Sequence, residues 1–165
     1  MSAAVIRDAV ATDFDAIVAL NAVEEGHTSP MDRARLEALH ALAAWHRVAT
    51  VDGRVAAFLL AMGEDCGYAN ANFEWFAAHT AGFLYVDRIV VGRGFQGLGL
   101  GSLLYRDLFA QARASGITRI ACEYNLVPPN EPSRLFHDKF GFREAGRQWL
   151  GDGTKQVSMQ IAAVA

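Results

Sequence analysis

A nearly continuous apolar run, Phe83–Val91, lies at the middle of the chain and is interrupted only at Asp87 and Arg88. Such a run predicts a strand that is buried on both faces. Two further apolar segments, residues 45–51 and 54–62, flank the dipeptide Asp52-Gly53. This dipeptide predicts a two-residue hairpin turn, because both of its positions must tolerate a positive φ angle.

Helices are expected between these strands. The first begins with Thr12 as its N-cap and ends near Val23. The second opens at Ser29-Pro30, since proline suits the first helical position, and ends near Ala43. The other expected elements are strands at 5–8, 117–124, 142–150 and 155–161 and helices at 73–79, 102–115 and 133–140. This order of elements predicts a mixed α/β sheet with helices on both faces.

A glycine-rich loop follows the central strand and precedes a helix. Gly97, Gly99 and Gly101 alternate with larger residues between Gln96 and Ser102. Glycines at this spacing leave backbone N–H groups uncovered and let an anion approach them closely. The positive end of the following helix faces the same loop. The loop therefore predicts a binding site for a phosphate or a diphosphate.

Other kinds of glycine loop fit less well. Residues 92–97 match the dinucleotide pattern G-x-G-x-x-G, but that motif would open its helix near Gly97 and place Gly99 and Gly101 inside it. Each helical glycine costs about 1 kcal/mol relative to alanine. A nucleoside-triphosphate loop needs a lysine where this chain has Gly101. A glycine turn that binds no ligand stays an open alternative.

Size and charge narrow the class of protein. A length of 165 residues favours one domain, and a net charge of −3 argues against nucleic-acid binding. The two cysteines, Cys66 and Cys122, lack the spacing of a disulfide framework or a metal site, so no metal is expected. Neither a signal peptide nor a membrane-spanning segment is evident, and a cytoplasmic location is expected.

Two motifs resemble one known family. The pattern Gln96-x-x-Gly99-x-Gly101 resembles the acetyl-CoA motif Q/R-x-x-G-x-G/A of the GNAT acetyltransferase superfamily. Residues 130–142 are similar to its pattern N-x-x-A/S-x-x-L/F-Y-x-x-x-G-F, without a gap. The resemblance extends over nearly the whole chain. It implies one GNAT-like acyl-CoA N-acyltransferase domain at 1–165, with a central mixed sheet of about seven strands. Homodimers are common in this superfamily.

The resemblance also implies where acetyl-CoA binds. Backbone groups of the central strand would bond the pantetheine arm, and the glycine loop would bind the diphosphate through its amides. Asn130 and Ser133 match positions that contact the same cofactor, although Asn130 equally suits a helix N-cap. The expected cofactor-binding residues are Ile89, Val90, Val91, Gln96, Gly97, Leu98, Gly99, Leu100, Gly101, Ser102, Asn130 and Ser133.

Three residues are candidates for proton transfer. Asp87 is the candidate base, and the alternative is that it forms an ion pair with an arginine elsewhere in the sheet. Arg88 is expected on the opposite face in a structural role. His137 stands where many family members have the tyrosine that protonates the leaving thiolate, with an anchoring role as the alternative. Tyr124 is the second candidate acid.

The expected acceptor is a primary amine of a small metabolite, which attacks acetyl-CoA directly. Glu24 and Glu25 lie where the family places substrate-recognition residues and would attract a cationic amine; the alternative is that they are solvated loop acids. Asn125, which precedes Pro128-Pro129, is expected to shape the same wall of the site. Cys122 lies on a presumed buried strand without a matched histidine, which disfavours a covalent thiol route. The alternatives are acetylation of a protein N-terminus and a domain that binds acyl-CoA without catalysis.

Overall fold

The computed structural model describes residues 3–25 and 28–164. In chain order the elements are β1 (Val5–Asp8), the 3-10 turn η1 (Ala11–Asp13), α1 (Phe14–Val23), α2 (Arg33–Leu42), β2 (Trp45–Val51), β3 (Arg54–Gly63), α3 (Ala71–His79), β4 (Phe83–Val91), η2 (Arg93–Phe95), α4 (Leu100–Ala114), β5 (Arg119–Val127), α5 (Glu131–Asp138), β6 (Arg143–Leu150) and β7 (Lys155–Ala163). The strands follow the order β1-β2-β3-β4-β5-β7-β6, which confirms the expected mixed sheet of about seven strands. None of the described helices is long and apolar enough to span a membrane.

The chain divides into two compact units. The first comprises residues up to Met62 together with Val86–Gln111, and the second comprises Gly63–Tyr85 and the chain from Ala112 onward. The boundary between the units therefore falls within β4, between Tyr85 and Val86.

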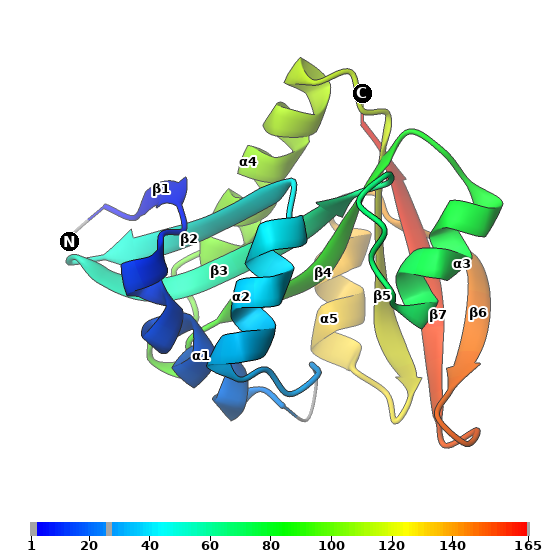
Figure 1. Ribbon diagram of the computed structural model, residues 1–165, viewed down its shortest axis with the longest axis horizontal. Coiled ribbons are helices and arrows are strands. Elements are labelled where there is room, and N and C mark those ends of the chain that lie inside the picture. The colour runs from blue at the N-terminus through cyan, green and yellow to red at the C-terminus, as the bar shows by residue number, and fades with distance from the viewer. Residues whose placement is uncertain (1–2, 26–27, 165) are drawn as a thin grey trace. The chain divides into compact units, whose positions relative to one another are not determined.

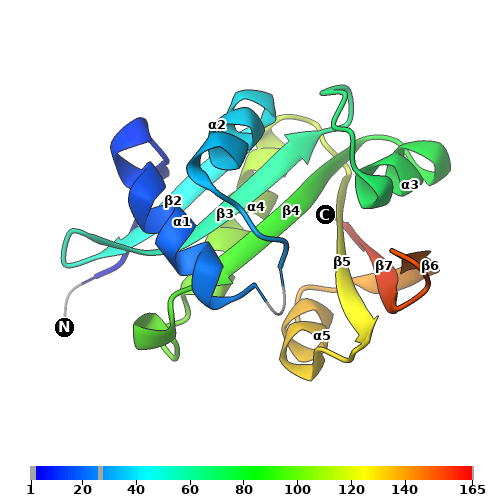
Figure 2. The ribbon, with the colours of Figure 1, turned by 60° about the horizontal axis from the view of Figure 1, so that its bottom comes forward.

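In the first unit, helices lie on both faces of the strands. Figure 2 shows α1 and α2 on one face of β2 and β3 and α4 on the other. On β2 the side chains alternate accordingly: Trp45 Nε1 donates to Asp107 of α4 at 3.0 Å, whereas the ring of His46 contacts that of Phe14 on α1. The core between these layers consists of fully buried side chains, among them Ile17, Leu36, Leu39, Val48 and Phe58.

The second unit is built on the antiparallel strands β5, β7 and β6 (Figure 1). Helix α3 packs on β6, where a Cβ atom on Gly146 would lie 2.5 Å from the indole of Trp75. Asn72 of α3 also accepts a hydrogen bond from Gln148 of β6 at 3.0 Å. Helix α5 lies on the opposite face of these strands (Figures 1 and 2), beside Tyr124 and Phe142.

The observed starts of the first two helices correct the expected ones. Thr12 is not the N-cap of the first helix, because it lies inside η1 and α1 begins at Phe14. The carboxylate of Asp13 is held by Val10 N at 2.8 Å and by the Arg7 guanidinium, which lowers the pKa of Asp13. Pro30 does not open the second helix: Asp32 is its N-cap and accepts from Arg35 N at 2.7 Å.

Candidate functional site

The parallel ladder between β4 and β5 lies in the second unit. It pairs Phe83, Leu84 and Tyr85 with Arg119, Ile120 and Ala121. Each strand continues for several residues beyond its last pair in this ladder, to Val91 in β4 and to Val127 in β5. The candidate residues Asp87, Tyr124 and Asn125 all belong to these continuations.

The glycine loop leads from β4 to α4 within the first unit. Gly92 N donates to Ala56 O of β3 at 2.8 Å, and a Cβ at Gly92 would lie 2.9 Å from Leu20. A larger residue at this position would force Leu20 to shift and would crowd the Ala56 carbonyl oxygen. Gly97 and Gly99 have φ angles of +84° and +73°, which larger residues rarely adopt, and open space surrounds both.

Helix α4 begins at Leu100, two residues before the expected start. At the start of this helix, Leu103 N donates a backbone hydrogen bond to the carbonyl oxygen of Gly99 at 3.0 Å. Helix geometry therefore gives the amides of Leu100, Gly101 and Ser102 no acceptor within the helix. These N–H groups and the positive end of a 15-residue helix can bind an anion together.

Asp87 forms an ion pair with its neighbour in the sequence. Arg88 Nε donates to Asp87 Oδ2 at 2.7 Å, and both side chains are only 4% exposed. Arg88 Nη1 also donates to Asn21 of α1 and to the carbonyl oxygen of Ser29, at 3.1 and 2.9 Å. Arg88 therefore fastens the segment between α1 and α2 to β4. One partner of Asp87 is thus its sequence neighbour on the same strand, and not an arginine elsewhere in the sheet.

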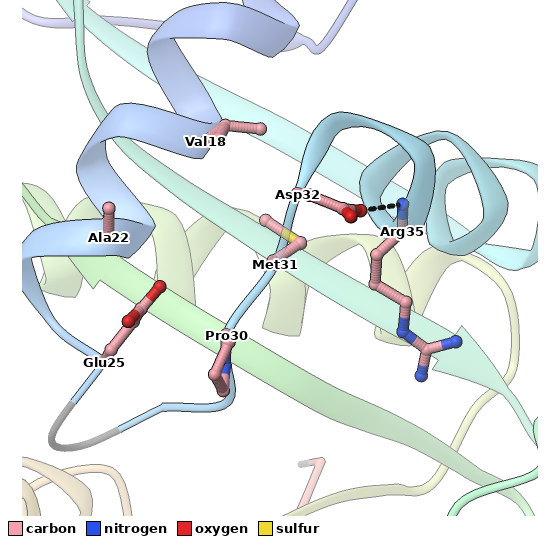
Figure 3. A pocket seen from close by; sticks show the side chains of 7 residues that line it. All are labelled: Val18, Ala22, Glu25, Pro30, Met31, Asp32 and Arg35. Atoms are coloured by element: carbon pink, nitrogen blue, oxygen red, sulfur yellow. Dashed lines mark hydrogen bonds between the residues drawn. The ribbon is translucent and has the colours of Figure 1, made fainter.

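Glu24 and Glu25, the two candidate substrate residues after α1, have different surroundings. Glu24 bonds Arg93 of η2 at 3.2 Å. Glu25 lines a cavity of about 400 Å³ within the first unit, whose wall is mostly apolar. Figure 3 shows Val18 and Ala22 of α1 on one side of this cavity and Pro30 and Met31 on the other. Its remaining lining residues are Asp32 and Arg35.

A carboxylate that the sequence analysis missed lies on β5. The hydroxyl of Tyr85 lies 2.9 and 2.8 Å from the two carboxylate oxygens of Glu123 and donates to them. Tyr85 is 1% exposed and packs against Phe73 and Phe76 of α3, so its hydroxyl is held in place. Glu123 follows the last ladder residue of β5, Ala121, by two positions. The alternating pattern of a strand gave no sign of this pair.

Helix α5 carries three of the expected residues. Asn130 is its N-cap, with Oδ1 accepting from Ser133 N at 3.4 Å. His137 is 4% exposed, and its Nδ1 lies 2.7 Å from the carbonyl oxygen of Ser133. A carbonyl oxygen only accepts, so Nδ1 carries a hydrogen. Burial lowers the pKa of His137, and the neutral ring then has a lone pair at Nε2.

Tyr124 ends a row of polar side chains on β5, β7 and β6. Gln160 Nε2 lies 3.2 Å from Tyr124 Oη and 2.6 Å from Ser158 Oγ, and Ser158 in turn donates to Glu144 at 2.6 Å. Burial raises the pKa of Tyr124, so the phenol keeps its proton at neutral pH. On the same strand Asn125 is 9% exposed, and its carbonyl oxygen accepts from Asn130 N at 3.2 Å.

Comparison with known proteins gives a family match over most of the chain. A family model described as "Acetyltransferase (GNAT) family" matches residues 14–142. A phosphinothricin N-acetyltransferase of Streptomyces coelicolor is 40% identical over 58 residues, which are 35% of this chain and 33% of that enzyme. The match thus spans about a third of the length of that curated relative.

Solved structures share the fold at low identity. Ard1 from Thermoplasma volcanium has a TM-score of 0.81 at 17% identity and covers 99% of both chains. The protein yncA from Salmonella typhimurium, solved with its cofactor acetyl-CoA, has a TM-score of 0.73 at 20% identity over 99% of this chain and 95% of its own. These likenesses support the fold expected from the two motifs.

Proposed function

This chain belongs to the GNAT acetyltransferase family, and we propose that it transfers acetyl from acetyl-CoA to a primary amine of a small molecule. The observation that carries the proposal is the glycine loop, whose amides from Gly97 to Ser102 would bind the diphosphate of the cofactor. The neighbouring structure with bound acetyl-CoA supports the choice of cofactor. The acetyltransferase that matches over 58 residues supports N-acetylation in general and leaves the acceptor open.

The pantetheine arm would bind as an added strand. We infer that it bonds the backbone of Ile89–Val91, the part of β4 beyond its ladder with β5. One amide at Val90 or Val91 would then donate to the thioester oxygen as negative charge develops there. Such a donor contributes about 3–4 kcal/mol to transition-state stabilisation. Correct placement of the amine and the thioester contributes roughly 7–11 kcal/mol more.

The attacking amine must lose a proton. An α-amino group with a pKa near 8 costs about 1 kcal/mol to deprotonate at pH 7, and a lysine-like amine near 10.4 costs roughly 4.6 kcal/mol. Two carboxylates are proposed as the acceptor of this proton: Asp87, as expected from the sequence, and Glu123. Asp87 also holds Arg88, so its replacement disturbs the structure as well as the chemistry. Glu123 accepts hydrogen bonds from the Tyr85 hydroxyl, which Glu123→Gln can still accept, so this variant gives the cleaner test.

The acceptor amine would be recognised from the segment that follows α1. Glu25 places a carboxylate on a mostly apolar cavity, which suits an amine with an apolar body. Asn125 is proposed as a further wall of the acceptor site. Glu24 would act indirectly, by holding Arg93. A homodimer remains a prediction of the resemblance, and a cytoplasmic location remains a prediction of the sequence.

The proposed function is tested by incubating the protein with acetyl-CoA and a panel of amines while free thiol is measured. Acetyl transfer predicts thiol release that depends on the amine and equals the amount of N-acetylated product. A domain that only binds acyl-CoA would bind coenzyme A in calorimetry and release no thiol. Activity on peptide N-termini alone would replace the small-molecule acceptor by a protein.

A further inference from the structure

Three residues of the first unit form a closed set of hydrogen bonds around the carbonyl oxygen of Ser29. Arg88 Nη1 of β4 donates to this oxygen at 2.9 Å and to Asn21 Oδ1 of α1 at 3.1 Å. Asn21 Nδ2 completes the set by donating to the same oxygen at 3.0 Å. Each of the three residues is therefore bonded to the other two. This set, the Ser29 clamp, consists of Asn21, Ser29 and Arg88.

The side chains of the clamp are shielded from water. Asn21 is 0% exposed and Arg88 is 7% exposed, and Arg88 is also paired with Asp87 at 2.7 Å. Water does not compete for hydrogen bonds in such surroundings, and a buried polar group that loses its partner is costly. The clamp therefore holds the backbone at Ser29 in one position against α1 and β4.

The clamp joins the two walls of the cavity of about 400 Å³ beside α1. One wall belongs to α1 and includes Ala22, and the other begins at Pro30 (Figure 3). Asn21 immediately precedes Ala22 in the chain, and Ser29 immediately precedes Pro30. The hydrogen bond between Asn21 and Ser29 thus lies one residue from each wall, so it sets how far apart the two walls stand.

The lining of this cavity suits a cationic amine with an apolar body. Its charged residues are two acids, Glu25 and Asp32, and one base, Arg35. The excess of negative charge attracts an ammonium group. The apolar part of the same molecule would be buried against the other lining residues, which are Val18, Ala22, Pro30 and Met31. The size of the apolar part that fits depends on the distance between the walls.

We propose that Asn21 and Arg88 are positioning residues that fix the width of this cavity, and that the protein thereby selects aliphatic primary amines by the size of their apolar part. This inference rests on the proposed acetyl transfer. Asn21 and Arg88 act through the walls of the cavity and not by contact with the amine. A fixed wall is what discrimination requires, because a wall that gives way accepts a longer amine as well as a shorter one.

The first test measures kcat/KM for primary alkylamines from ethylamine to octylamine. The wild-type protein should show an optimum length, with kcat/KM lower by about tenfold or more for an amine that is too long or too short by a methylene group. Asn21→Ala removes both hydrogen bonds of Asn21, so this preference should fall by about tenfold. The change should arise in KM for the amine, with KM for acetyl-CoA unaltered. An unchanged length preference in a folded Asn21→Ala variant would overturn the proposal.

Asp13→Asn is the matched control. Asp13 is a buried polar residue of the same unit, and it bonds Arg7 and Val10, which do not line the cavity. Its replacement should lower stability and leave the length preference as in wild type. A purely structural role of Asn21 would likewise reduce activity toward all amines alike and leave their ratio unaltered. Equal changes of preference in both variants would contradict the clamp.

Ala22→Phe tests the cavity wall independently of the clamp. Ala22 is exposed, so the added ring should not disturb folding. The ring should fill part of the cavity and raise KM for the amine of optimum length by about tenfold, with ethylamine affected least. An unchanged KM for that amine would place the acceptor elsewhere and overturn the proposal.

Calorimetry with the same alkylamines, in the presence of coenzyme A, separates this inference from the proposed function. The wild-type protein should bind them with an optimum length that Asn21→Ala weakens. If this pattern is found and no amine is acetylated, only the proposed function is overturned. If amines are acetylated and Asn21→Ala leaves the length preference unaltered, only the inference is overturned. Absence of alkylamine binding by the wild-type protein would also overturn the inference.

Discussion

Arg88 and Asp87, neighbours on β4, form an ion pair of 2.7 Å in which both side chains are 4% exposed. The same guanidinium reaches Asn21 on α1 and the backbone of Ser29. The pair thus connects the strand that would bind the thioester to the segment that would bind the acceptor. Asp87 has a structural role whether or not it also takes a proton.

Removal of Asp87 should destabilise the protein. Asp87→Ala leaves the buried Arg88 without its anion, and breaking a buried pair in this way costs about 3–5 kcal/mol. The free energy of unfolding in urea should fall by an amount of this order. Asp15→Ala is the control, because Asp15 pairs with Arg33 while 91% exposed; it should cost less than about 1 kcal/mol. Equal losses in both variants would contradict a buried ion pair at Asp87.

Substitutions in the glycine loop should weaken cofactor binding. Gly99→Val forces a β-branched residue into a φ of +73° and moves the amides at the start of α4. The affinity for coenzyme A, measured by calorimetry, should fall by about tenfold or more, the equivalent of about 1.4 kcal/mol. Gly94→Ala is the control, since it has open space around it and no positive φ. Undiminished affinity in Gly99→Val would remove the loop from the cofactor site.

Glu123 should matter most for amines that are charged at neutral pH. Glu123→Gln keeps an acceptor for the Tyr85 hydroxyl but cannot take a proton. With a lysine-like amine, kcat/KM at pH 7 should fall by about 10²-fold and recover as pH rises toward the pKa of the amine. Glu74→Gln, a change of an exposed acid in the same unit, should have no effect. A loss that is independent of pH would assign Glu123 a structural role.

The stability of the protein should decrease as pH is lowered, because of His46. This histidine lies 2.8 Å from His40, Nδ1 to Nδ1, and burial together with His40 lowers its pKa from 6.5 to about 4, against a smaller opposing effect of Asp13. Between these two values the unfolded chain binds a proton that the folded protein does not. The free energy of unfolding should therefore decrease as pH falls from about 6.5 to about 4, by roughly 3 kcal/mol in all.

His46→Leu should remove most of this pH dependence, measured by urea unfolding at several pH values. His79→Leu, a change at an exposed histidine, should leave it in place. A pH dependence in His46→Leu as steep as in wild type would contradict the buried neutral state of His46.

Local sequence patterns predicted the strands and the loop but not the features that depend on distant partners. The observed bounds of β1, β2 and β4 match the predicted ranges, and Asp52 and Gly53 adopt the positive φ angles that the hairpin requires. The predicted start of α2 at Ser29-Pro30 was wrong, because the helix begins at Arg33. The carbonyl oxygen of Ser29 instead accepts hydrogen bonds from Asn21 and Arg88, residues that a local pattern does not connect to it.

In the candidate site, too, local features could be predicted from the sequence, whereas contacts between distant residues could not. The positive φ angles of Gly97 and Gly99 were predictable because the preference of glycine for such angles is a local property of the chain. Glu123 was missed because its partner, Tyr85, is 38 residues away in the sequence. The contact between Gln160 and Tyr124 was missed because the two residues are 36 positions apart and Gln160 has no motif of its own. The direction of a hydrogen bond follows only from partners that the fold brings together.

The central claim is that this chain moves acetyl from acetyl-CoA to an amine, and amine-dependent release of free thiol tests it most directly. The account predicts release in proportion to N-acetylated product, with a marked decrease in Gly99→Val at limiting acetyl-CoA. Thiol release that is the same with and without amine, or none with any amine in the panel, would contradict it.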